Sequence, residues 1–130
     1  MHPIENPFLE ELGVELTAWS ADRAEMTLAL NPTLLNRIGR VQGGVLCTLL
    51  DAVCGYAGLF SEPGEPRKRN VSLSITTNFL DSGDGTRLVA KGVVERRGKG
   101  IYFARGEVWL DDALLVATGI GTFKYLKPEA

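Results

Sequence analysis

One aspartate stands alone in the most apolar stretch of this 130-residue chain. Residues Val45 to Phe60 carry a single charge, on Asp51, and the pair Gly43-Gly44 precedes them. The apolar residues cover more than one face of a 3.6-residue period, which predicts a helix surrounded by protein. An acid in such a helix is costly unless it is paired, hydrogen-bonded or used. Asp51 is therefore the leading candidate for a nucleophile or a general base.

The glycine pair offers a second chemical group. Gly43 and Gly44 stand where the helix is expected to begin. The first N–H groups of a helix have no partner within it, and the helix dipole favours negative charge there. Because glycine lacks a Cβ, a ligand can approach the backbone closely. Such a helix start can polarise a carbonyl group and hold the developing oxyanion. The alternative is a tight glycine loop followed by an aspartate that only caps or pairs.

The spacing of these residues resembles that of the hotdog-fold acyl-CoA thioesterases, of the phenylacetate-pathway (PaaI-like) type. The family pattern is an asparagine, His-Gly-Gly six residues later, and an acid nine residues after the histidine. Asn36, Gly43, Gly44 and Asp51 match this pattern, whereas Gln42 stands at the histidine position. The resemblance implies hydrolysis of an acyl-CoA thioester to a free acid and coenzyme A.

Other polar residues are candidates for supporting roles. The Gln42 amide can donate and accept hydrogen bonds but cannot change charge near neutral pH, so we expect it to hold the loop or contact the substrate. Asn36 could bind the substrate or orient a water, or equally brace its own loop. By the family pattern Ser72 is the hydroxyl that positions the water, and Thr77 is a nearby candidate for substrate binding.

Two basic clusters could meet the phosphates of coenzyme A. Arg96, Arg97 and Lys99 surround Gly98 in a glycine-rich turn, and a second cluster spans Arg67 to Arg69. Basic side chains and exposed turn N–H groups are suited to binding phosphate. The alternative is an ordinary solvated face.

Gly43 and Asp51 are separated by about 12 Å along a helix axis, because Asp51 follows Gly43 by eight positions. They could hardly flank one carbonyl in a single chain. Two antiparallel helices related by a two-fold axis would bring Gly43 of one chain beside Asp51 of the other. The resemblance implies this arrangement, with composite active sites in a homodimer or homotetramer. The alternative of a non-catalytic acyl-CoA binding or sensing domain is disfavoured by the acid itself.

The elements expected to position these residues make one α+β hotdog domain over residues 1–130, in which an antiparallel sheet curls around the central helix. The periodicity of the apolar residues and the positions of the turn residues predict a short helix and six strands in addition to the central helix. The expected elements are the helix Asn6 to Leu12, the strands Val14 to Ser20 and Arg23 to Leu30, and the later strands Val71 to Leu80, Arg87 to Arg97, Ile101 to Leu110 and Leu114 to Tyr125.

Charge, hydrophobicity and cysteine spacing bear on which other classes of protein and site are compatible with the sequence. The net charge of -2 gives no bias toward nucleic acid, and the apolar run is short for a membrane span. No apolar leader is expected at the N-terminus. Cys47 and Cys54 would lie about 10 Å apart on the helix, too far for a disulfide, which favours reduced thiols and a cytoplasmic location. With His2 as the only histidine, neither a metal site nor histidine-dependent hydratase chemistry is expected, and no cofactor motif is present.

Overall fold

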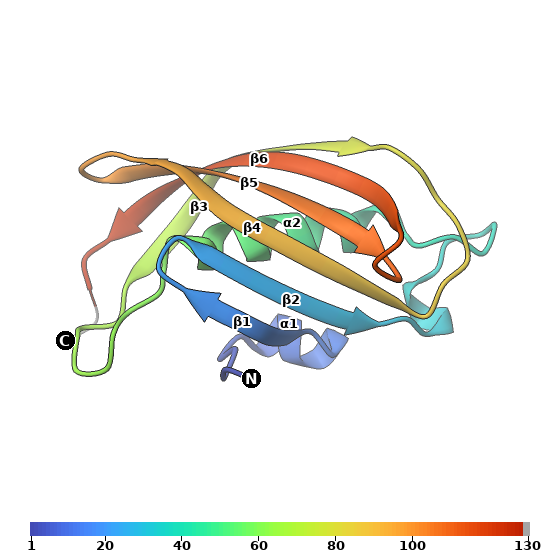
Figure 1. Cartoon of the computed structure of the whole chain (residues 1–130), viewed down its shortest axis with the longest axis horizontal. Coiled ribbons are helices and arrows are strands. Elements are labelled where there is room, and N and C mark those ends of the chain that lie inside the picture. Colours follow the sequence, from blue (N-terminus) through green and yellow to red (C-terminus); the bar gives the residue numbers. More distant parts are fainter. Residues whose placement is uncertain (129–130) are drawn as a thin grey trace.

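A six-stranded antiparallel sheet curls around one long helix in the computed structural model, which describes residues 1–128 (Figure 1). The strand order is β1-β2-β4-β5-β6-β3. The elements are α1 (Pro7–Leu12), β1 (Glu15–Ser20), β2 (Arg23–Ala29), the 3-10 turn η1 (Pro32–Leu34), α2 (Gly43–Ala57), β3 (Arg69–Phe79), β4 (Arg87–Arg97), β5 (Ile101–Leu110) and β6 (Leu114–Leu126). The predicted α+β hotdog arrangement is confirmed.

Local sequence signals fixed several element ends as expected. Asn6 caps α1, where its Oδ1 accepts from the Leu9 N–H at 3.0 Å, and Gly13 ends the helix with a φ of 93°. The predicted bounds of β4 and β5 are confirmed. The turn η1 was not predicted; Asn31 caps it by accepting from the Thr33 N–H.

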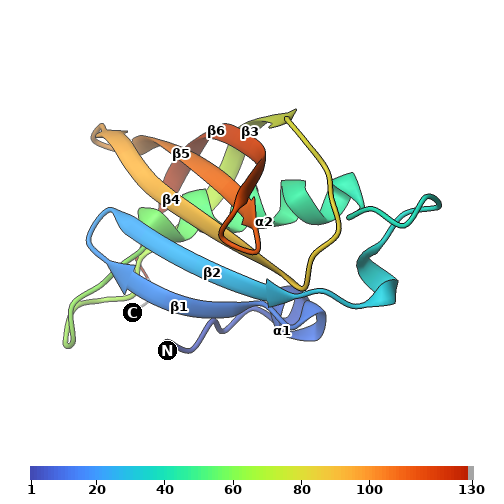
Figure 2. The same ribbon diagram turned by 45° about the vertical axis from the view of Figure 1, so that its right-hand side comes forward.

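A row of glycines lets the sheet lie directly on α2. Gly92, Gly106 and Gly119 are aligned across β4, β5 and β6 by the strand register. A Cβ on Gly92 would lie 2.4 Å from the carbonyl oxygen of Val53, and one on Gly106 would lie 2.9 Å from the sulfur of Cys54. At Gly92 the strand meets the helix backbone itself, whereas at Gly106 and Gly119 side chains of α2 occupy the space that a sheet side chain would need. The helix lies behind these strands in Figure 2.

Gly92→Ala should therefore be among the most destabilising small substitutions in the sheet. Its new methyl group meets helix backbone, which cannot swing aside, so we expect the free energy of unfolding to fall by about 3 kcal/mol or more. Gly100→Ala is the matched control, since a Cβ there meets nothing within 4 Å. Urea unfolding of both variants measures the difference, and equal stabilities would contradict this account of the packing.

The side of α2 that faces away from the sheet is left open by its own chain. Val45, Leu49, Leu50 and Val53 are buried against the sheet. The side chains of Cys47, Thr48, Asp51 and Ala52 are only half-buried. One chain thus covers α2 on one side and leaves the other open.

Among residues 1–128, no helix is long and apolar enough to cross a membrane.

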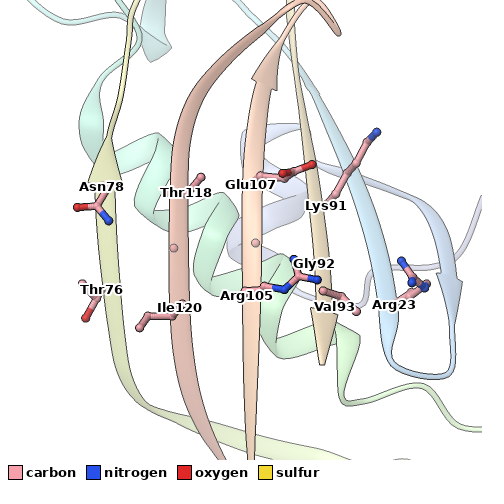
Figure 3. A pocket seen from close by; sticks show the side chains of 12 residues that line it. Arg23, Thr76, Asn78, Lys91, Gly92, Val93, Arg105, Glu107, Thr118 and Ile120 are labelled. Carbon is pink, nitrogen blue, oxygen red and sulfur yellow. The ribbon is translucent and has the colours of Figure 1, made fainter. Parts of the chain in front are cut away.

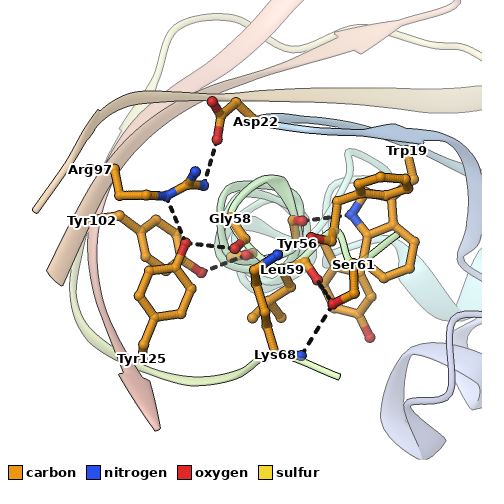
Figure 4. A network of polar contacts seen from close by, with 12 residues as sticks. Trp19, Asp22, Tyr56, Gly58, Leu59, Ser61, Lys68, Arg97, Tyr102 and Tyr125 are labelled. Atoms are coloured by element: carbon orange, nitrogen blue, oxygen red, sulfur yellow. Dashed lines mark hydrogen bonds and ion pairs between the residues drawn. The ribbon is translucent and has the colours of Figure 1, made fainter. Parts of the chain in front are cut away.

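Side-chain donors hold the C-terminal end of α2, where backbone carbonyls lack partners within the helix (Figure 4). The bonds are Trp19 Nε1 to Tyr56 O at 2.7 Å, Tyr102 Oη to Gly55 O at 2.6 Å, Tyr125 Oη to Gly58 O at 2.7 Å and Lys68 Nζ to Phe60 O at 2.6 Å. Burial raises the pKa of Tyr102, so its hydroxyl stays protonated and remains a donor. These contacts fix the helix, and with it Asp51, relative to the sheet.

Candidate active site

Asp51 and Ser72 meet across the groove between α2 and β3. The Ser72 hydroxyl donates to Asp51 Oδ1 at 2.6 Å. Asp51 is half-buried and Ser72 is exposed, so the acid is reachable by water and ligands. Its own chain therefore does not enclose Asp51. Two residues that the sequence assigned to the catalytic set are thus in contact, and the hydrogen bond engages only Oδ1 of the carboxylate.

Two hollows open on either side of this contact, and both include Thr48, Asp51 and Ser72 in their walls. The first, called here the α1 hollow, has a volume of about 240 Å³. Its further walls are Asn6, Phe8 and Leu9 at α1, Ala52, Gly55 and Tyr56 on α2, and Asn70 on β3.

The second hollow, called here the β3 hollow, has a volume of about 560 Å³. It is completed by Cys47 and by β3 residues that include Ile75 and Thr77. Thr77 Oγ1 is buried and has no hydrogen-bond partner within residues 1–128. A buried hydroxyl without a partner is costly, so Thr77 is a group that a ligand, a water or another chain would satisfy.

A third hollow of about 410 Å³ lies on the opposite face of the sheet (Figure 3). It sits over the glycine row of β4, β5 and β6, and Lys91, Arg105 and Glu107 are among its walls. None of the predicted catalytic residues lines it. Although it is well formed, it lies away from Asp51 and Ser72, so the two hollows in the α2–β3 groove are the better candidates for the reacting site.

The start of α2 carries two free amides. Gly43 and Gly44 are the first two helical residues, and neither N–H makes a hydrogen bond within residues 1–128. A Cβ added to Gly44 would meet nothing within 4 Å, whereas one on Gly43 would lie 3.4 Å from the Phe79 ring. Gln42 holds the N-cap position with an exposed side chain that makes no capping bond. The two amides at the position predicted for oxyanion donors therefore lack partners within residues 1–128 and are open to a ligand.

The two halves of the predicted site do not meet within one chain. α2 runs without a break from Gly43 to Ala57, so Gly43 and Asp51 are about 12 Å apart along its axis. A carbonyl that contacts the Gly43 amide cannot also lie against the Asp51 carboxylate of the same protomer.

A family model described as Thioesterase superfamily matches residues 38–117, which span the loop, α2 and most of the sheet. The chain belongs to the thioesterase superfamily. The Salmonella typhimurium protein named medium/long-chain acyl-CoA thioesterase YigI is 24% identical over 130 residues, covering 90% of this chain and 84% of that protein. The Mycobacterium tuberculosis protein Rv1847 is 37% identical over 107 residues, covering 80% of this chain and 71% of its own.

Solved structures show the same fold. The Rv1847 structure superposes with a TM-score of 0.84 at 25% identity, covering 96% of this chain and 100% of that one. The Escherichia coli PaaI protein, from the phenylacetic acid degradation operon, gives a TM-score of 0.82 at 22% identity, covering 95% and 87%. Family membership favours a thioester hydrolase over the non-catalytic binding domain that the sequence left open.

Asn36 of this thioesterase braces the loop before α2. Its Oδ1 accepts from the N–H groups of Ile38 at 3.0 Å and Arg40 at 3.1 Å, and Gly39 completes the turn with a φ of 79°. The carboxamide oxygen is thus engaged in the loop. Only the Asn36 amide nitrogen is left for the substrate contact that the sequence predicted.

The basic residues of the β4–β5 hairpin are less free than expected. Arg97 forms an ion pair with Asp22 and an Nε bond to the Tyr125 hydroxyl at 3.1 Å, and the Gly98 N–H donates to the Ile101 carbonyl at 2.7 Å. Arg96 and Lys99 are exposed. None of these four lines either hollow beside Asp51, so a role in binding coenzyme A stays a prediction for them.

The sequence reasoning missed Asn70 as a site residue. Asn70 lies two residues before Ser72 and, like Ser72, lines the α1 hollow. Residues two apart on a strand share a face, so the assignment of Ser72 already pointed to Asn70. No sequence signal indicated that Asn6 and Phe8 would line the same hollow, because no short-range pattern predicts that α1 lies beside β3.

Proposed function

We propose that this thioesterase hydrolyses acyl-CoA thioesters to a free acid and coenzyme A, with Asp51 as the catalytic carboxylate. The observation that carries the proposal is the Ser72–Asp51 hydrogen bond, placed between two open hollows in the α2–β3 groove. The name of the YigI relative supports an acyl-CoA substrate.

The chemistry follows from the two groups. In the general-base form, Asp51 takes a proton from water while the water oxygen bonds to the thioester carbon. The carbonyl oxygen becomes an oxyanion and is held by the free N–H groups of Gly43 and Gly44. Collapse of this intermediate breaks the C–S bond, and the leaving thiolate of coenzyme A takes up the proton. In the nucleophilic form, Asp51 attacks the carbon itself and the C–S bond breaks, which releases the coenzyme A thiolate and leaves a mixed anhydride. Water then hydrolyses the anhydride and regenerates the Asp51 carboxylate, and the two protons of the water end on the free acid and on the thiolate. Ser72 holds the carboxylate in place in either form.

A second copy of the chain would complete the site, and the edge of β3 supports this. Within the part of the chain that the structure describes, residues 1–128, β3 is an outermost strand of the sheet and pairs with β6 alone. From Asn70 to Leu80 it carries no charge. Its large exposed apolar side chains are Val71, Leu73, Phe79 and Leu80. A long, uncharged, apolar edge is a template for pairing with another chain, so we propose a homodimer that is formed through antiparallel β3 strands.

That pairing would unite the two halves of the reaction. Phe79, at one end of β3, packs near Gly43, and Ser72, nearer the other end, binds Asp51. Antiparallel pairing centred near the middle of β3 brings the Phe79 end of the partner's strand to the Asn70 end of the first protomer's strand. The partner's Gly43 follows Phe79, so its free amides arrive at Asp51. The dimer would hold two such sites, and pairs of dimers could form the tetramer also expected.

Location follows the substrate. Acyl-CoA thioesters are made and used inside cells, and both cysteines are free thiols, as is usual in a reducing compartment. We therefore propose a cytoplasmic enzyme.

The test of the function is release of free coenzyme A thiol from a panel of acyl-CoA esters, measured beside equilibrium binding of the same esters. Turnover is the expected outcome. Binding of every ester without turnover would instead favour the sensing role and overturn the proposed hydrolysis.

Gly44→Ala should separate stability from activity. A methyl group on Gly44 meets no protein atom, and alanine favours helix over glycine, so the thermal midpoint should stay equal or rise. The same methyl group occupies the space through which a carbonyl would reach the amide, so we expect kcat/KM to fall at least about tenfold. Thermal unfolding and hydrolysis rates are measured on one preparation. An alanine variant with full activity would exclude the helix start from the site.

A further inference from the structure

The α1 hollow is polar where a pocket for an alkyl chain would be apolar. Ligand pockets are lined mostly by apolar side chains with few polar groups. Here six of the ten lining residues carry polar side chains: Asn6, Thr48, Asp51, Tyr56, Asn70 and Ser72. Asp51 is one of its walls, so an acyl group whose carbonyl lies at the carboxylate has its tail within reach of the hollow.

One polar atom in this hollow has no partner. The Tyr102 hydroxyl donates its proton to the Gly55 carbonyl at 2.6 Å. It must therefore accept the bond from Asn70, whose Nδ2 lies 2.6 Å away. This fixes the orientation of the amide, because only its nitrogen can donate. Asn70 Oδ1 is left with no hydrogen bond within residues 1–128, on a side chain that lines the hollow.

The distance from the reacting carbon to this acceptor is set by α2. The Asn70 amide packs on Gly55, 3.3 Å from where a Cβ would stand. Gly55 lies four residues after Asp51, or about 6 Å along the helix. A water-sized group takes about 30 Å³, so a volume of about 240 Å³ holds roughly eight non-hydrogen atoms. The tail of a six-carbon acyl group fits within its walls, and that of a twelve-carbon group would extend beyond them into solvent.

We propose that the α1 hollow receives the acyl group and that Asn70 selects short acyl groups that carry a hydrogen-bond donor, such as a hydroxyl, at their far end. This rests on the proposed function. The acyl groups proposed here are shorter than the medium and long chains in the name of the YigI relative. Asn70 Oδ1 accepts the hydroxyl proton of the substrate, while a methyl group in its place leaves the amide oxygen without a partner.

The experiment compares kcat/KM for 6-hydroxyhexanoyl-CoA and for heptanoyl-CoA, which has a methyl group where the first has its hydroxyl. The wild-type enzyme should favour the hydroxylated ester by about tenfold, and dodecanoyl-CoA should be poorer than heptanoyl-CoA. Asn70→Leu, close in shape to asparagine, should abolish or reverse the preference. Asn78→Leu is the matched control, because Asn78 lies on the same strand and lines the hollow on the opposite face; it should leave the ratio unchanged.

The outcomes separate this proposal from the function beneath it. Equal rates for the two esters with the wild-type enzyme would overturn the role of Asn70 without any variant, even if Asn70→Leu failed to fold. An Asn70→Leu enzyme that is slower on both esters by the same factor would show that Asn70 acts only through Tyr102 on the position of α2. A wild-type enzyme that hydrolyses no acyl-CoA at all would instead overturn the proposed function.

Discussion

Asp51→Asn should lower kcat by at least about a hundredfold while leaving the fold unchanged. Asparagine keeps the shape of the side chain and an oxygen that can accept from the Ser72 hydroxyl, now 2.6 Å from Asp51 Oδ1. It cannot take a proton from water or form an anhydride. Because Asp51 is only half-buried, its replacement by a neutral amide should have little effect on the free energy of unfolding.

The measurement is kcat for the best ester of the panel, with circular dichroism and thermal unfolding of the same samples. Asp112→Asn is the matched control: Asp112 is exposed and paired with Arg87, and it lines neither hollow beside Asp51. That variant should keep wild-type kcat. A folded Asp51→Asn enzyme with near wild-type turnover would remove Asp51 from the catalytic role in both forms of the mechanism.

The sequence was most informative where capping residues, turn residues and the periodicity of apolar residues determine the local structure. Asn6 and Gly13 mark the ends of α1 as cap residues do, and the glycine-rich and aspartate turns separate β4, β5 and β6. The bracing role of Asn36 is equally local, because all its bonds lie within four residues. These features need no knowledge of what packs where.

Prediction failed where neighbours come from distant segments. The partner of Arg97 is Asp22, 75 residues away, and the register of β2 on β4 is what brings them together. The glycine row is also invisible in the sequence, since Gly92, Gly106 and Gly119 align only after the strands pair.

Asp51 itself shows the limit of counting apolar residues. Cys47 and Ala52 read as apolar in the sequence, yet they lie on the half-open side of α2 with Thr48 and Asp51. Hydrophobicity indicates that a surface avoids water, and it does not indicate whether the same chain or another covers it. The apolar count and the half-exposed aspartate are compatible if a second copy of the chain covers this side, as proposed.

Mixing two inactive variants should therefore restore activity. Asp51→Ala removes the carboxylate, and Gly44→Val fills the open space before the free amides, where a Cβ meets no protein atom. Each homodimer is inactive because both of its composite sites are damaged. In a mixed dimer, one site holds both mutations and the other holds an intact Asp51 facing the partner's intact Gly44.

The size of the rescue follows from the two-fold symmetry. Random exchange between equal amounts makes half of the dimers mixed, and each has one of two sites intact, so activity should recover to about one quarter of wild type. The variants are co-refolded or co-expressed with different tags, and the unseparated mixture is assayed for the one-quarter recovery. The mixed dimer is then purified through both tags, and it should show about one half of wild-type activity because one of its two sites is intact. Variants simply combined without subunit exchange form the control. If each site were built within a single chain, mixing would give no rescue, because every protomer would carry one of the two mutations in its own site. An enzyme that is fully active as a monomer would likewise show no rescue.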